Sequence, residues 1–350
     1  MLKEKSILKF MKIFPTKKIG IDLGTSSSLV YVAKEGIVYN QPSLVTLNKK
    51  TGQLVAFGYE AQKMVGRTPA HLSVVKPLVG GVISDFEIAQ QLLKYFLDQL
   101  REKSFLFARF FVALSIPCGV TEVEKKAVED ATKDAGASRV FLIEEPIAAA
   151  LGARLPIKEA KGFMVVDIGG GTSEIAVISL GGIVNYKSLR IAGDKMDSEI
   201  INYISEEYKV LIGQPTAEEL KKTIGSVYGK FSDLPDSMLI KGRDLFSGLP
   251  KEIEVFSKDV RRAIERPVSQ IIESVKNVIE ETPPELVADI MKNGIFLSGG
   301  GSLLRGIDQL LEKETGVKTI IVNDPLTAVV RGTGILIENQ DNLEELGIKI

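Results

Sequence analysis

Two short segments of the sequence combine an aspartate with a turn of small residues, and this combination suits phosphate binding. The first reads IGIDLG over residues 19–24, and the second reads MVVDIG over residues 164–169. The small residues of the turns are Thr25, Ser26, Ser27 and Ser28 in the first segment and Gly169, Gly170, Gly171 and Thr172 in the second. Glycine lets backbone N–H groups approach a phosphate closely, and hydroxyls add donors. Asp22 and Asp167 are placed to hold a hydrated Mg²⁺ through water.

The two segments belong to an internal repeat. After each turn the chain re-enters an apolar run, at residues 29–33 and 175–178, and then reaches a Gly-Ile-Val triplet. The second copy looks one residue longer before Thr172 closes its turn. Asp22 and Asp167 are 145 residues apart, so we predict two similar lobes that face each other, each built on the same strand, aspartate and glycine turn.

A third glycine turn lies near the C-terminus. It consists of Ser298, Gly299, Gly300, Gly301 and Ser302 and follows the apolar run 295–297. Because no Gly-Lys-Ser/Thr follows, a P-loop is poorly supported. We expect the turn to open a helix near Leu303 and its glycine backbone to pack on a base or ribose. A tight strand-to-helix turn without a ligand is the alternative.

A carboxylate with a possible role in hydrolysis lies in the segment 143–150, which reads IEEPIAAA. Glu145 directly precedes the proline and an alanine-rich helix. One interpretation is that it only complements the positive end of the helix dipole. The other is that it orients or deprotonates a water that attacks a γ-phosphate.

Composition removes several other chemistries. The 350 residues include one histidine, His71, and one cysteine, Cys118. A zinc cluster therefore lacks ligands, an intrachain disulfide is impossible, and a histidine-based triad would depend on His71. With 44 basic and 45 acidic residues the net charge is −1, so no overall field attracts nucleic acid. The low cysteine content fits a reducing cytoplasm.

Short apolar runs alternate with helical patterns, which predicts an α/β protein. Length also favours two lobes, because single cores stop growing at about 250–300 residues. Capping boxes predict helix starts at Ser84, Thr121 and Thr216, and Pro267 is expected to start or kink a helix. The predicted strands are residues 18–23, 110–116, 140–143, 162–168, 174–179 and 295–297.

The first fourteen residues and one internal segment suggest contact with a membrane. Residues 1–14 carry a local charge of +3, and as a helix they would place Ile7, Leu8, Met11 and Phe14 on one face. Such a helix suits an interfacial anchor, although a frayed leader or a helix packed on the body is the alternative. Phe105, Leu106 and Phe107 are either a second insertion site or the early start of a strand. No apolar run reaches the roughly 18 residues of a membrane-spanning helix.

Taken together, these segments resemble the actin-like ATPase superfamily, which includes actin, DnaK-type chaperones and sugar kinases. Within it the sequence is similar to the MreB family of bacterial cell-shape actins from about residue 18 to residue 334. The strings that carry the resemblance are IGIDLGTSSSLVYV, KPLVGGVISDFE, FLIEEPIAAALGA, VVDIGGGTSEIAVISLGGIV, AGDKMDSEI, LSGGGSLLRGID and DPLTAVVRGTG. Two segments depart from the common pattern: Ser26-Ser27-Ser28 replaces Ala-Asn-Thr, and Thr223 stands where a glutamate is common.

The resemblance implies a duplicated actin-like fold, of the ribonuclease H-like type, with a mixed sheet and flanking helices in each lobe and ATP bound between the lobes. It implies that Thr25, Ser26 and Ser27 form the first phosphate loop, and Gly169, Gly170 and Gly171 the second. Asp22 and Asp167 would be associated with Mg²⁺, and Glu145, assisted by Thr172, would position the hydrolytic water. The implied adenosine-lining residues are Glu218, Glu219, Leu220, Lys221, Gly299, Gly300, Gly301 and Ser302.

The implied organisation is a leader (1–15), lobe I (16–158, with an inserted subdomain at 46–78), lobe II (159–325, with one at 195–258) and a return to lobe I (326–350). The implied function is a slow, switch-like ATPase that forms ATP-dependent filaments on the inner face of the cell membrane. There it would direct wall synthesis, maintain rod shape and contact membrane proteins of the elongation machinery, without nucleic acid. A sugar kinase would need a catalytic aspartate and a sugar pocket, for which we see no sequence feature. A chaperone would need a peptide-binding domain, and the sequence ends at Ile350 without one.

Overall fold

The computed structural model describes residues 16–80, 82–83, 86–102, 108–229 and 235–339. The chain forms two compact units. Unit 1 combines the residues up to Gly152 with those from Val329 onward, and unit 2 is Ala153–Ala328. The lobe and subdomain boundaries given above remain predictions.

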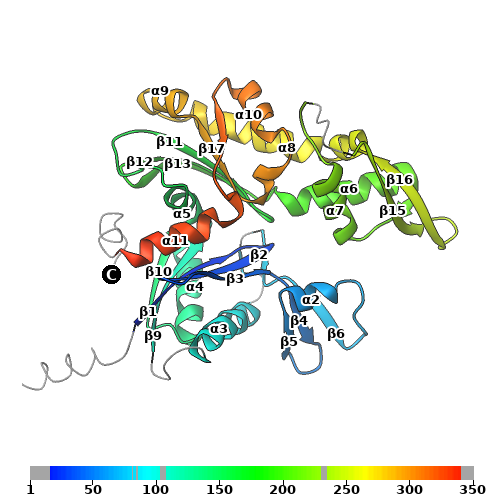
Figure 1. The fold of residues 1–350 in the computed structure, drawn as a ribbon, viewed down its shortest axis with the longest axis horizontal. Helices are drawn as coiled ribbons and strands as arrows, with labels where there is room; N and C mark the ends of the chain where they lie inside the picture. The colour runs from blue at the N-terminus through cyan, green and yellow to red at the C-terminus, as the bar shows by residue number, and fades with distance from the viewer. Residues whose placement is uncertain (1–15, 81, 84–85, 103–107, 230–234, 340–350) are drawn as a thin grey trace, which may run out of the picture. The chain divides into compact units, whose positions relative to one another are not determined.

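Unit 1 is built on a mixed five-stranded sheet with the order β10-β9-β1-β2-β3 (Figure 1). Its strands are β1 (Thr16–Leu23), β2 (Ser27–Val32), β3 (Gly36–Pro42), β9 (Arg109–Ile116) and β10 (Arg139–Glu144). The first strand pairs antiparallel with β2 and parallel with β9. Because apolar side chains alternate along β1 and β9, they meet α3 (Phe86–Glu102) in a core around Phe96 and Phe110, both fully buried.

Smaller elements complete unit 1. A three-stranded sheet has the order β5-β4-β6 and is accompanied by a short helix and a two-stranded ribbon. These elements are β4 (Val45–Asn48), β5 (Leu54–Phe57), β6 (Leu72–Val75), α2 (Tyr59–Lys63), β7 (Leu78–Val79) and β8 (Val82–Ile83). The remaining helices of the unit are α4 (Glu122–Asp134), α5 (Glu145–Gly152) and α11 (Ala328–Glu338).

Unit 2 repeats the sheet of unit 1 with the same topology. Its order is β18-β17-β11-β12-β13, in which β11 pairs antiparallel with β12 and parallel with β17. The strands are β11 (Phe163–Ile168), β12 (Ser173–Ser179), β13 (Gly182–Leu189), β17 (Ile295–Ser298) and β18 (Thr319–Ile321). The duplicated α/β fold expected from the repeat is therefore confirmed, and each of the six predicted strands is present to within one or two residues.

The helices of unit 2 are α6 (Gly193–Tyr208), α7 (Gln214–Ile224), α8 (Ser257–Glu280), α9 (Pro284–Asn293) and α10 (Ile307–Thr315). In Figure 1, the long helix α8 runs from the sheet toward α6 and α7. A separate small sheet consists of β14 (Val210–Leu211), β15 (Ser237–Asp244) and β16 (Pro250–Phe256).

The predicted helix starts have mixed outcomes. The capping box at Thr121 is confirmed, because its hydroxyl accepts from the Glu124 N–H at 3.2 Å. The predicted start at Thr216 is wrong, because α7 begins at Gln214, after Gly213, with a proline in its first turn. A proline fits the first turn of a helix, since its missing N–H costs nothing there. Ser84 lies outside the described residues. Pro267 starts no helix and lies inside α8.

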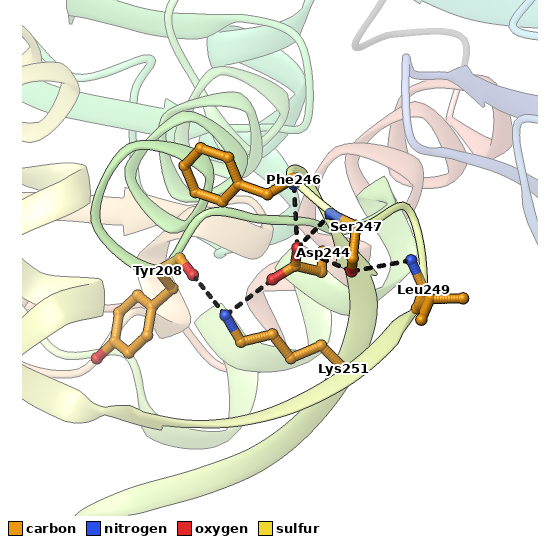
Figure 2. A network of polar contacts seen from close by, with 6 residues as sticks. All are labelled: Tyr208, Asp244, Phe246, Ser247, Leu249 and Lys251. Carbon is orange, nitrogen blue, oxygen red and sulfur yellow. Dashed lines mark hydrogen bonds and ion pairs between the residues drawn. The ribbon is translucent and has the colours of Figure 1, made fainter.

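The turn between β15 and β16 is held by a network around Asp244 (Figure 2). The Asp244 carboxylate accepts from the backbone N–H groups of Phe246 at 3.0 Å and Ser247 at 2.8 Å. The Lys251 ammonium lies 3.0 Å from its other oxygen. The hydrogen bond from the Ser247 backbone, followed by that from Lys251, holds the pKa of Asp244 well below its usual range. This network keeps the turn ordered although Phe246 is exposed.

Among the described residues, no helix is both long enough and apolar enough to cross a membrane. The residues predicted to contact a membrane, Ile7, Leu8, Met11, Phe14, Phe105, Leu106 and Phe107, lie outside the described residues.

Helix α11 packs on α5 with direct contact between their backbones. A Cβ atom added to Gly332 would lie 1.8 Å from the carbonyl oxygen of Ala148, and one added to Gly334 would lie 2.6 Å from the ring of Tyr31. The Glu338 carboxylate at the end of α11 accepts from the Tyr31 hydroxyl at 3.0 Å. Glycine therefore sets how closely α11 approaches α5, the helix that begins at Glu145.

We predict that Gly332→Ala lowers the free energy of unfolding by about 3 kcal/mol, because the added methyl group must push two helices apart. This loss should exceed the gain of about 1 kcal/mol that alanine brings to a helix. Urea unfolding followed by circular dichroism measures the change. Gly182→Ala is the control, since its Cβ atom would meet nothing closer than 3.9 Å. Equal stability of the two variants would contradict the close-packing argument.

Candidate functional site

The glycine turns of the two units have the same length and the same closing hydrogen bond. The Gly24 N–H donates to the Ser27 carbonyl at 3.0 Å, and the Gly169 N–H donates to the Thr172 carbonyl at 2.9 Å. Asp22 pairs across its hairpin with Leu29, and Asp167 pairs with Glu174, seven residues further on in both cases. The expectation that the second turn is one residue longer is therefore wrong. It came from matching the threonines, whereas Thr172 corresponds in position to Ser27.

In unit 1 the carbonyl oxygens of the turn are bound by one residue, Ser43. Its hydroxyl donates to the Gly24 carbonyl at 2.6 Å, and its N–H donates to the Ser26 carbonyl at 2.9 Å. The Ser28 hydroxyl lies 2.7 Å from the Ser43 hydroxyl, and both side chains are fully buried. Because a trans peptide points its C=O and N–H to opposite sides, the N–H groups of Thr25 and Ser27 point away from Ser43.

In unit 2 the N-terminus of α6 has the same role. The Gly193 N–H donates to the Gly169 carbonyl at 3.2 Å, and the Asp194 N–H donates to the Gly170 carbonyl at 2.7 Å. By the same geometry the N–H groups of Gly170 and Gly171 point away from α6. Successive N–H groups that point to one side form an anion-binding concavity. The turn of unit 2 thus has a backbone suited to an anion, whereas the turn of unit 1 directs the alternate N–H groups of Thr25 and Ser27 away from Ser43.

Each aspartate accepts a hydrogen bond from a serine on the neighbouring parallel strand. The Ser115 hydroxyl donates to Asp22 at 3.0 Å, and the Ser298 hydroxyl donates to Asp167 at 2.5 Å. The strand register places Ser298 directly opposite Asp167. The contacts of these serines with the aspartates were missed from the sequence, although a signal exists: both β9 and β17 contain a Leu-Ser pair near the carboxyl end.

Asp167 is buried, with 6% of its surface exposed. Burial raises the pKa of its carboxyl group to about 6, and the Ser298 hydrogen bond works in the opposite direction. A buried carboxylate that is ionised at neutral pH favours a cation beside it. The described residues contain no group of three or more His, Cys, Asp or Glu side chains that could hold a metal ion. Mg²⁺ is a cation that proteins usually bind through one or two carboxylates, with water or phosphate oxygens as its other ligands.

Glu145 lies at the junction predicted for it. Strand β10 ends at Glu144, and α5 begins at Glu145 with Pro146 in its first turn. Glu145 is 9% exposed, and the helix behind it is buried along its whole length. Thr172, its predicted assistant, is also buried and belongs to unit 2. The small side chains of α5 allow close packing, as the sequence indicated.

The predicted adenosine residues on α7 point in different directions. Leu220 is fully buried in the core of unit 2, next to Ala217 and Ile224 on the same helix, so its side chain has a packing role. Glu219 is exposed, and Glu218 pairs with Lys222 at 2.6 Å. The Lys221 ammonium points back to α6, where it donates to the Gly193 carbonyl at 2.9 Å. Lys221 thus connects α7 to the residues that hold the second phosphate turn.

The third glycine turn packs against the strand end that leads into the second phosphate turn. A Cβ atom added to Gly299 would lie 2.4 Å from the Ile168 carbonyl oxygen, and one on Gly301 would lie 2.2 Å from the Ile168 side chain. Ser302 is fully buried and donates to the Gly299 carbonyl at 2.6 Å. A Cβ atom on Gly300 would meet only Leu326, at 3.3 Å. Packing on protein therefore explains two of the three glycines.

The helix expected near Leu303 is not an α-helix. The segment Gly300–Leu303 forms a single 3₁₀ turn, η1, and α10 begins only at Ile307. Gly299 and Gly306 both have positive φ values, 77° and 81°, and such turns interrupt a helix. Another 3₁₀ turn, η2 (Pro325–Thr327), precedes α11.

Each unit has an aspartate and a glycine turn at the end of the first strand of its sheet, and we call the turn pinned because hydrogen bonds hold its carbonyl oxygens. Two sheets of the same topology with these features define an actin-like, two-lobed fold. The same fold is found in the structure titled "MamK double helical filament", which has a TM-score of 0.78 and 23% sequence identity, with 93% of this chain and 99% of that chain covered.

Comparison with known proteins then identifies the family. The family model described as MreB/Mbl protein matches residues 16–345. The chain is 46% identical over 334 residues to the cell shape-determining protein Mbl of Bacillus cereus, covering 95% of this chain and 99% of Mbl. It is 43% identical over 337 residues to the cell shape-determining protein MreB of Escherichia coli K12, covering 95% and 96%. The chain belongs to the MreB/Mbl family.

Solved structures of similar sequence have also been determined with a nucleotide. The structure of MreB5 of Spiroplasma citri bound to ADP has a TM-score of 0.89 and 42% identity, with 94% of this chain and 98% of that chain covered. The structure of the same protein bound to AMPPNP has a TM-score of 0.89 and 43% identity, with 95% and 99% covered.

We predict that Asp167→Asn stabilises the nucleotide-free protein at neutral pH. The folded carboxyl group has a pKa of about 6 against the usual 3.8, so the wild type loses stability as pH rises between these values. The variant carries no charge there, and its advantage should grow from near zero at pH 4 to roughly 3 kcal/mol above pH 7. Urea unfolding at both pH values without Mg²⁺ measures it. A difference independent of pH would contradict the effect of burial on Asp167.

Proposed function

We propose that this chain is an ATPase that binds ATP with Mg²⁺ and assembles into ATP-dependent filaments that direct wall synthesis and maintain rod shape. The observation that carries the proposal is the pinned glycine turn of unit 2, in which Gly170 and Gly171 follow the buried Asp167 by three and four residues. The names of the relatives, cell shape-determining proteins, support the cellular role. The ADP and AMPPNP bound to MreB5 of Spiroplasma citri support the choice of nucleotide.

In this proposal the turns bind phosphate oxygens through backbone N–H groups, assisted by the hydroxyls of Thr25, Ser26 and Ser27. When bound, Mg²⁺ supplies positive charge that neutralises the phosphates, and Asp22 and Asp167 hold it through water. Adenosine lies along Glu218, Glu219 and Lys221 and against the backbone of Gly299–Ser302. Glu145 orients the attacking water and accepts its proton, with the Thr172 hydroxyl as a second contact to that water.

Hydrolysis would act as a switch on assembly. ATP and ADP differ by one phosphate group, so their different contacts with the turns would favour different states of the protein. We propose that the ATP-bound state assembles and that hydrolysis weakens the filament. A sugar kinase or a chaperone is less well supported, because the relatives named above are cell shape-determining proteins and align with the chain over most of their own length.

The place of action that we propose is the inner face of the cell membrane, in the cytoplasm. Residues 1–14 and Phe105, Leu106 and Phe107 carry this part of the proposal from their sequence pattern alone. Two weak insertions on one molecule add through avidity, and assembly multiplies them further. Membrane proteins of the elongation machinery are the proposed partners there.

We predict that Glu145→Gln slows phosphate release from ATP by about 10²-fold or more, because it removes the general base, while ATP affinity changes only a few-fold. A coupled phosphate assay and a nucleotide titration measure the two quantities. Glu144→Gln is the matched control, since Glu144 is the neighbouring carboxylate at the end of β10. If turnover falls in the control and not in Glu145→Gln, the role belongs to Glu144.

We also predict that the protein sediments with anionic liposomes in the presence of ATP and that deletion of residues 1–14 reduces the pelleted fraction several-fold. The physical reason is loss of one of two apolar contacts and of a local charge of +3. Electron microscopy of the pellet reports whether filaments are present. A soluble monomer under every nucleotide and lipid condition would refute the proposed function.

A further inference from the structure

Asp197 is a buried carboxylate that the proposed chemistry does not use. It lies one turn into α6, and only 3% of its surface is exposed. The Lys221 ammonium of α7 lies 2.6 Å from its Oδ1 atom. Burial raises the pKa of Asp197, and Lys221 acts in the opposite direction. An isolated buried charge is costly, so the pair holds α6 and α7 together.

The same ammonium is linked to the second phosphate turn through one peptide group. Lys221 donates to the carbonyl of Gly193 at 2.9 Å. The N–H of that same peptide group, on Asp194, donates to the carbonyl of Gly170 at 2.7 Å. A planar trans peptide therefore carries a hydrogen bond at each end, one from α7 and one to the turn. Hydrogen bonds in such a chain polarise and strengthen one another.

Asp197 is placed to fix Lys221 in this arrangement. Gly193 and Asp197 are four residues apart on α6, so they lie on the same face one turn from each other. A single ammonium group on α7 can therefore reach both. The carboxylate holds the ammonium by charge, and the ammonium in turn holds the Gly193–Asp194 peptide that supports Gly170.

The C-terminal end of α7, which carries Lys221, is also tied to the third glycine turn. The Arg305 guanidinium donates to the carbonyl of Lys222 at 3.1 Å, and the Val227 N–H donates to the Arg305 carbonyl at 2.9 Å. Arg305 follows the turn Gly299–Ser302 by three residues. A cation at the carbonyl end of a helix is favourable. Helix α7 is thus connected to both glycine turns of unit 2.

We propose that Asp197 is a positioning residue for nucleotide binding. Through Lys221 and the Gly193–Asp194 peptide it sets the spacing between α7, which carries the adenosine segment, and the phosphate turn at Gly169–Thr172. Asp197 itself touches no nucleotide. Lys221 belongs to the segment along which adenosine lies, but its ammonium group acts on the Gly193 carbonyl and Asp197 rather than on the base. The inference rests on the proposed nucleotide-binding function and explains how the adenosine segment and the phosphate turn of unit 2 are aligned.

The consequence is a gain in binding affinity that is available only to a ligand with both an adenosine group and a phosphate group. When two subsites are held at the right spacing, binding one end of a ligand brings the other end to its subsite at high effective concentration. Adenosine alone uses one subsite, whereas ADP uses both. Loss of the alignment should therefore weaken ADP much more than adenosine.

The test is the ratio of ADP affinity to adenosine affinity, measured by displacement of a fluorescent adenine nucleotide. The variants are Asp197→Asn, Lys221→Met and the double variant, which leaves no unpaired charge and so keeps the fold. Lys276→Met is the matched control, because Lys276 pairs with Glu314 at the same 2.6 Å elsewhere in unit 2. We expect the ratio to fall about tenfold in Asp197→Asn and in the double variant, and to stay within about twofold of wild type in the control.

The affinity ratio of the double variant should be no lower than that of the single variant with the larger loss, since both substitutions break the same ion pair. An unchanged ratio in the double variant would overturn the inference. The inference would also be overturned if Lys221→Met lowered the affinities for adenosine and ADP equally and Asp197→Asn did not. The Lys221 ammonium would then contact the base. A wild-type protein that binds no ADP would instead refute the proposed function itself.

Discussion

The hydrogen bonds that pin the carbonyl oxygens of the glycine turns are the constraint on which the rest of the structure depends. A glycine turn alone has many conformations, and most of them offer no set of converging N–H groups. In unit 1, Ser43 removes this freedom, and in unit 2 the N-terminus of α6 does so. Because C=O and N–H lie on opposite sides of each peptide, fixing the carbonyls also fixes the donors. The turn is then organised for an anion before any ligand arrives.

Duplication gave both units the same sheet, the same aspartate and the same turn, yet the supports behind the turns differ. Unit 1 uses a buried serine pair, Ser28 and Ser43. Unit 2 uses a whole helix, and that helix is connected onward to α7 through Lys221 and Asp197. Among the described residues, the contacts of unit 2 therefore link its phosphate turn to a second segment expected to line the nucleotide. In the proposed function, the base would bind in unit 2, where this connection exists.

The sequence alone predicted the features that are local in the chain: the six strands, the duplicated aspartate and turn, and the junction at Glu145. Prediction from the sequence failed where contacts between residues far apart in the chain determine the structure. The turn length was wrong because Thr25 and Thr172 resemble each other without being equivalent, and only the strand register separates them. The Ser298–Asp167 and Lys221–Asp197 contacts join elements that are far apart in sequence or on different helices. The burial of Leu220 could have been predicted from the sequence, because its spacing from Ala217 and Ile224 is that of a buried helix face.

We propose that the pinned turn and helix α7 of unit 2 together bind an adenine nucleotide. The most direct measurement is a crystal structure of the protein with a non-hydrolysable ATP analogue and Mg²⁺. We expect phosphate oxygens within hydrogen-bond distance of the N–H groups of Gly170 and Gly171, adenosine between α7 and Gly299–Ser302, and an intact Lys221–Asp197 pair. A nucleotide bound elsewhere, or phosphates held by side chains with the turn amides unused, would contradict it.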